Sequence, residues 1–133
     1  MLDQRLQLAL PRLDQLTPAQ AAIAGAVRRW VLARHMRRCP LQVAHERLGC
    51  VQAARALHLL LETVRGCWPE PFAISPPCCS VLSHDEATLL VMIDTAGERR
   101  RLAFDGLLCE MLGPDVRDRL FAACATLART LEG

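Results

Sequence analysis

The chain has 133 residues, a formal net charge of +2, 52% hydrophobic residues and 23% charged residues. This composition excludes a disordered chain, which would have fewer apolar residues and a larger net charge. The sequence holds no apolar run of the ~18 residues that a bilayer span requires, and its first residues lack the basic-then-apolar pattern of a signal peptide. We therefore expect one cytoplasmic domain over residues 1–133, with its seven cysteines reduced and no membrane contact.

The charges are unevenly distributed along the chain. Residues 1–66 carry ten arginines against four acidic residues, a net charge of +6, whereas residues 67–133 carry six arginines against ten acidic residues, a net charge of −4. The two halves could attract each other within the fold or across a dimer interface, and the basic half could meet an acidic partner. All sixteen basic residues are arginine, which indicates the codon bias of a GC-rich genome more than selection for guanidinium chemistry.

The first third of the chain predicts two helices. A short helix over residues 2–10 ends at Pro11. A longer helix over residues 19–38 begins at Thr17-Pro18, because threonine caps a helix and proline suits its first position. Apolar residues at helical spacing form its predicted core stripe: Ile23, Val27, Trp30 and Val31. The same face continues toward the end of this helix as Arg34, Arg37 and Arg38.

Two further helices are predicted after a break at Pro40. Residues 41–48 form a short helix that Gly49 ends, and residues 51–65 form a strongly amphipathic helix that Gly66 ends. The apolar face of this second helix is predicted to consist of Val51, Ala54, Leu57, Leu61 and Val64.

Residues 67–82 differ from the rest of the chain. Four prolines within these sixteen residues exclude a helix, and the segment also holds Trp68, Phe72 and three of the seven cysteines. We expect an irregular connection, with a short edge strand around residues 72–74. Connections of this length within a compact domain are often functional.

The second half of the chain predicts three more helices. Ser83 and Glu86 have the spacing of a capping box, which begins a helix over residues 84–95. Two further helices cover residues 99–112 and residues 115–131, separated by a Gly-Pro break. These segments together predict an all-α fold: a compact bundle of about five helices plus one or two short helices, with the Pro/Cys-rich irregular connection in its middle.

A zinc site is one interpretation of the central segment. Its candidate ligands are Cys67, Cys78, Cys79 and His84, because zinc prefers thiolate and imidazole. Their spacing matches no common structural site, since the chain has no Cys-x-x-Cys pair and adjacent cysteines point apart in an extended chain, so zinc is not favoured. The cysteines could instead act as redox-sensing thiols near a helix N-terminus, or be small side chains that only pack beneath the loop.

Arginines crowd one part of the chain and define a candidate partner site. The six within residues 28–47 are Arg28, Arg29, Arg34, Arg37, Arg38 and Arg47. We assign partner binding to Arg34, Arg37 and Arg38, at the end of the long helix. Nucleic-acid binding by the Arg28–Arg47 patch is a weaker interpretation, because Arg55 falls where a helix-turn-helix needs a buried apolar residue and no RNA-binding sheet is predicted. The arginines could also form a basic face that only contacts solvent.

Catalytic signatures do not occur in the sequence. It has no phosphate-binding glycine loop, no Gly-x-Ser-x-Gly and no His-Glu-x-x-His motif. We therefore predict a protein that is not an enzyme. Its expected function is that of a helical interaction or regulatory domain, acting on a protein partner or as a homodimer.

One segment resembles a known family. The chain is similar to a small uncharacterised bacterial family, a domain of unknown function, in the stretch Ile74-Ser-Pro-Pro-Cys-Cys-Ser-Val-Leu-Ser-His-Asp-Glu-Ala-Thr-Leu-Leu. In that signature a cysteine run precedes a capped helix that opens with Asp-Glu, and the resemblance extends over roughly residues 20–95. This chain has two adjacent cysteines where the family often has three, which counts against a metal role. The resemblance implies no activity or cofactor, and it directs attention to Cys78, Cys79, Ser83, Asp85 and Glu86.

Overall fold

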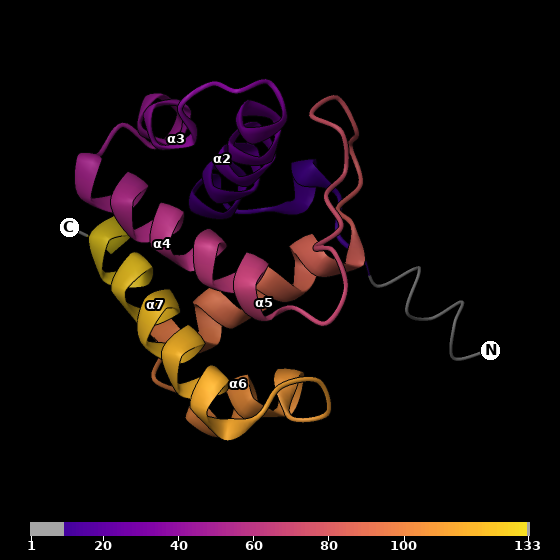
Figure 1. The fold of residues 1–133 in the computed structure, drawn as a ribbon, viewed down its shortest axis with the longest axis vertical. Coiled ribbons are helices and arrows are strands. Elements are labelled where there is room, and N and C mark those ends of the chain that lie inside the picture. The colour runs from indigo at the N-terminus through magenta and orange to yellow at the C-terminus, as the bar shows by residue number, and fades with distance from the viewer. Residues whose placement is uncertain (1–9, 133) are drawn as a thin grey trace.

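The computed structural model describes residues 10–132, which form six α-helices and one short 3-10 turn (Figure 1). The elements are η1 (Leu13–Gln15), α2 (Pro18–His35), α3 (Pro40–Leu48), α4 (Val51–Cys67), α5 (His84–Gly97), α6 (Arg101–Leu108) and α7 (Pro114–Glu132). Within this range the only β-type pairing is an isolated bridge between Arg12 and Val81. The all-α prediction is confirmed, whereas the helix predicted over residues 2–10 lies outside the described residues.

Two of the predicted helix starts, at Thr17 and at Ser83, are confirmed in detail. The Thr17 hydroxyl accepts a hydrogen bond from the Gln20 backbone N–H, at 3.2 Å, and the Gln20 side chain accepts one from the Thr17 N–H, at 3.0 Å. Ser83 and Glu86 form the same reciprocal pair at the start of α5, at 3.0 and 2.8 Å. Both are capping boxes, which satisfy backbone donors that a helix end leaves unpaired.

Two predicted helix ends are wrong by two or three residues. Helix α2 stops at His35 because Arg37 takes a left-handed backbone conformation, with φ 57°, ahead of Pro40. Helix α4 continues through Gly66 to Cys67. It ends where it does because Pro69 forces the preceding residue, Trp68, into an extended conformation.

Two further predictions differ from the structure. Helix α6 covers only residues 101–108 of the predicted 99–112, because Arg99 has a φ of 59° and the helix begins after it. The edge strand predicted at residues 72–74 is absent, and this stretch is irregular. Its prolines leave few backbone donors for a strand ladder.

The helices form two groups that meet along α4 and α7 (Figure 1). In the first group α2 contacts α3 and α3 contacts α4; in the second, α5 contacts both α6 and α7. Helix α2 also contacts α5, which closes the molecule on a second side. Residues 68–83 connect the two groups and are tied to the start of the described chain, where the Leu13 N–H donates to the Ser80 carbonyl at 2.8 Å and the Leu82 N–H to the Pro11 carbonyl at 3.1 Å.

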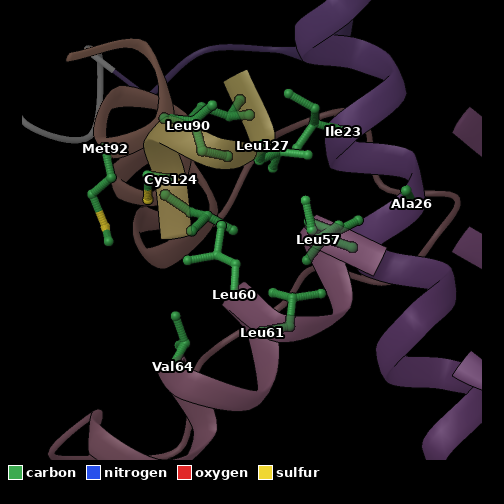
Figure 2. Packing of buried hydrophobic residues seen from close by; sticks show 14 of the residues in the cluster. Ile23, Ala26, Leu57, Leu60, Leu61, Val64, Leu90, Met92, Cys124 and Leu127 are labelled. Carbon is green, nitrogen blue, oxygen red and sulfur yellow. The ribbon is translucent and has the colours of Figure 1, made fainter. Parts of the chain in front are cut away.

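Side chains from all six helices form one buried apolar cluster, part of which is shown in Figure 2. Its largest fully buried members include Trp30, Phe104, Leu57, Leu60, Met92, Leu120 and Leu127. The predicted stripes are correct for most positions but not for Val51, which is 47% exposed, or for Val31, which is half-buried. None of the helices described here is long and apolar enough to cross a membrane.

Candidate functional site

Arg28 belongs to the core rather than to the basic surface on which the sequence placed it. Its side chain is only 2% exposed and forms an ion pair with the equally buried Glu86, from Nε to Oε2 at 2.7 Å. A second hydrogen bond runs from Nη2 to Glu86 Oε1 at 3.1 Å. The guanidinium also donates to the backbone carbonyls of Cys79, at 2.7 Å, and Val81, at 3.2 Å. Arg28 therefore joins α2, the irregular connection and the start of α5.

The Arg28–Glu86 pair has a structural consequence. Hydrogen bonding to Glu86 raises the pKa of Arg28 above its usual value, against the opposing effect of burial. Arginine is charged at every accessible pH in any case, so the guanidinium is a permanent cation beneath the cysteine-bearing loop. With its charge neutralised by Glu86 and its surface covered, Arg28 cannot contribute to a binding patch, which corrects the Arg28–Arg47 interpretation at this residue.

The three arginines assigned to partner binding have different surroundings. Arg34 is engaged within the fold: its Nη1 donates to Glu62 Oε1 at 2.7 Å, and its guanidinium lies 5.2 Å from the centre of the Trp30 ring. Arg37 and Arg38 lie beyond the end of α2 and are exposed. Neither forms an ion pair with another residue in the described range.

A groove of about 410 Å³ lies between α2 and α3, which run side by side in Figure 1. We call it the basic groove; it is lined by Arg29, Leu32, Ala33, Met36, Arg38, Val43, Glu46 and Arg47. Four of these residues, 29, 32, 33 and 36, have the spacing of one helix face. Their helical spacing could therefore have indicated this face from the sequence. The prediction was based on the arginines at the end of the helix, and it selected Arg34 and Arg37 in place of Arg29.

The arginines of the basic groove are not neutralised within the fold. Across residues 10–132, no ion pair or side-chain hydrogen bond involves Arg29, Arg38 or Arg47. Arg47 packs against Gly25 of α2, where an added Cβ atom would lie 2.5 Å from its Nε. Gly25 thus gives Arg47 the space to lie across α2, next to Arg29.

The residues predicted as zinc ligands do not assemble into a metal centre. No three His, Cys, Asp or Glu side chains between residues 10 and 132 lie where they could hold a metal ion together. His84 is exposed at the start of α5, and all seven cysteines are free thiols. Cys79 lies at the end of a turn, with its N–H donating to the Pro76 carbonyl at 2.9 Å and its thiol to the Val81 carbonyl at 3.4 Å.

Two other cysteines are shielded from solvent. Cys124 of α7 is fully buried, and this burial raises the pKa of its thiol far above the ordinary value. Burial also raises the pKa of Cys67, although the nearby Arg119 acts in the opposite direction. Both residues are therefore neutral thiols near pH 7, a form that is a poor nucleophile and a poor metal ligand.

Comparison with protein-family models, with curated proteins and with solved structures finds no match for this chain. The resemblance of residues 74–90 to an uncharacterised family stays a prediction. Inferences about function therefore depend on the geometry and charge of the chain itself.

Proposed function

We propose that this chain is a non-catalytic interaction domain whose basic groove binds an acidic, partly apolar segment of a protein partner. The single observation that supports this proposal is that three arginines, Arg29, Arg38 and Arg47, line one groove together with apolar side chains and form no ion pair in the described range. Arg28, Arg34 and Arg101 are instead held in ion pairs with acidic residues of the fold. Other arginines, such as Arg55 and Arg119, also form no ion pair in the described range, so the distinguishing feature of the basic groove is that three such arginines line it together with apolar side chains.

The apolar part of the groove favours a peptide over a nucleic acid. Leu32 in the last turn of α2 is 44% exposed, and Met36, which caps the end of α2, is 53% exposed. An amphipathic partner segment can cover them with its own apolar side chains while its acidic residues meet the arginines. A phosphate backbone would leave Leu32 and Met36 uncovered and would find no aromatic ring among the lining residues on which to stack a base.

The arginines and the apolar residues of the basic groove should contribute to partner binding in different ways. Arginines at the rim of an interface mainly steer association and select the partner, whereas buried apolar contacts contribute more to affinity. We expect both groups to matter. Losing the three guanidiniums should weaken binding about tenfold, equivalent to about 1.4 kcal/mol.

The test is to select peptides on the native chain from a displayed random library. The enriched sequences should combine acidic with large apolar residues, and a labelled peptide of that sequence should bind in fluorescence anisotropy. The variant R29Q/R38Q/R47Q should bind it about tenfold more weakly. The control R55Q/R119Q/R129Q removes three exposed arginines elsewhere and has the same net charge, so its binding should stay within about twofold of native.

Several outcomes would refute the proposal. Enriched peptides without acidic residues, or equal loss of binding in the two triple variants, would remove the basic groove as the site. Tighter binding of a single-stranded oligonucleotide, with a steep loss of affinity on adding salt, would assign the groove to nucleic acid. Light scattering on the native chain tests the homodimer prediction, in which the acidic half of a second copy would be the partner.

A further inference from the structure

A second and larger groove lies on another side of α2, away from the basic groove. It measures about 630 Å³ and is enclosed by the last turns of α2 and α4 and by the start of the irregular connection. We call it the aromatic groove; its lining includes Trp30, Arg34, His35, Arg65, Trp68 and Phe72. Its volume falls in the range of about 300–1,000 Å³ that is typical of small-molecule sites.

One wall of the aromatic groove is a short strap of aromatic and proline residues. Trp68 and Phe72 meet edge to face, with ring centres 5.3 Å apart. The three residues between them are Pro69, Glu70 and Pro71. Each proline fixes its own φ and restricts the residue before it, so the strap has few alternative conformations. A wall that is already rigid costs a bound ligand little ordering entropy.

A second wall carries two guanidinium groups that one carboxylate brings together. Glu62 of α4 accepts from Arg34 Nη1 at 2.7 Å, and its other oxygen lies 3.6 Å from Arg65 Nη1. Glu62 therefore brings an arginine of α2 and an arginine of α4 next to each other at the groove. A guanidinium has five N–H groups, so each arginine retains donors that Glu62 does not occupy.

These two walls specify the chemistry of a ligand. Aromatic rings favour a flat apolar body, and arginine donors in a planar fork favour a carboxylate. Glu70 lines the groove, and Glu62 lies behind the two arginines as their ion-pair partner. Both carboxylates would repel a ligand with several negative charges. A cation would be opposed by Arg34 and Arg65.

We propose that the aromatic groove binds an aromatic monocarboxylate, with the ring against Trp68 and Phe72 and the carboxylate on Arg34 and Arg65. This site is separate from the basic groove and does not depend on the interaction function proposed above. Glu62 acts as a competitor for the same guanidinium donors, so it sets an upper limit on the affinity. Removing its charge should therefore strengthen binding, which a merely structural ion pair would not predict.

The chain provides its own reporters for the test. It has two tryptophans, and both line the aromatic groove. We would titrate the native protein with 2-naphthoate and with 2-naphthamide, its uncharged analogue, and follow the two indole N–H signals by NMR. Naphthoate should shift the Trp68 signal most, because the Trp30 ring is buried and its N–H donates to His58 Nδ1. It should bind at least about tenfold more tightly than naphthamide, because the charge-assisted hydrogen bonds need the carboxylate.

Three variants complete the experiment. R65Q should lose about tenfold in naphthoate affinity, and E62Q, at a half-buried position, should gain about threefold. The variant R29Q/R38Q/R47Q should bind naphthoate like the native chain, which separates this site from the basic groove. Unmoved indole signals at about 5 mM naphthoate, equal affinity for naphthamide, or weaker binding by E62Q would each overturn the proposal.

Discussion

Arg28 makes four hydrogen bonds through its three side-chain nitrogens, and all four acceptors come from residues 79–86. Removing the charge of Glu86 would leave a permanent cation in the core without compensation. Such a loss is costly even though an intact buried ion pair adds little net stability, because both ions were desolvated on folding. The pair thus fixes where the irregular connection lies against α2.

The substitution Glu86→Gln isolates this effect, since glutamine can still complete the capping box with Ser83. We expect the free energy of unfolding to fall by about 3 kcal/mol, measured by urea denaturation. The control Glu98→Gln, at an exposed site, should change it by less than about 0.5 kcal/mol. The double variant R28M/E86Q should recover part of the loss, because no charge is then buried. Equal stability of E86Q and E98Q would contradict this account.

At the level of the elements, α5 and α7 approach each other closely at a glycine. A Cβ atom added to Gly97, the last residue of α5, would lie 2.8 Å from the Cβ of Ala128. Gly106 in α6 has open space around it instead. Replacing glycine with alanine should therefore change stability in opposite directions in the two helices. At Gly97 the close packing of α7 decides the effect, whereas at Gly106 the backbone entropy of glycine decides it.

Gly97→Ala should lower the free energy of unfolding by about 1–2 kcal/mol, because one of the two helices must shift. Gly106→Ala should raise it by about 0.5–1 kcal/mol, since alanine is the better helix former. Thermal or urea unfolding of both variants checks the pair. A gain in stability for Gly97→Ala would show that α5 and α7 can separate without cost.

For the whole molecule, the response to alkaline pH depends on its cysteines. The sequence has no tyrosine and no lysine, so thiols are its main groups that titrate between pH 8 and pH 11. The unfolded chain releases the Cys124 proton above about pH 9, whereas the raised pKa keeps the folded thiol neutral. Rising pH then favours the unfolded state, because only that state loses the proton.

We expect the free energy of unfolding to be independent of Cys124 ionisation below about pH 8, and to fall by up to about 1.4 kcal/mol per pH unit above about pH 9. Urea denaturation in a reducing buffer measures this slope. It should be shallower in Cys124→Ala, with a smaller remainder from Cys67. Cys109→Ala, at an exposed position, is the control and should keep the native slope. An unchanged slope in Cys124→Ala would refute the assignment.

The local features of the fold could be predicted from the sequence by itself. Caps at Thr17 and Ser83, the stop at Gly49 and the exclusion of helix by four prolines depend on residues only a few positions apart. These contacts form wherever the local chain folds, so they need no knowledge of the tertiary structure. The all-α class follows from them together with the helical spacing of apolar residues.

Only the tertiary structure decided which charged residues are accessible to a binding partner. Arg28 and Arg29 are neighbours in sequence, yet one is paired with Glu86, 58 positions away, and the other lines the basic groove. The sequence showed a run of arginines and a capping glutamate, but nothing local indicated that two of these charges meet. Burial and ion pairing depend on how distant helices pack, and for that reason we propose the partner site in the groove between α2 and α3 rather than at Arg34 and Arg37.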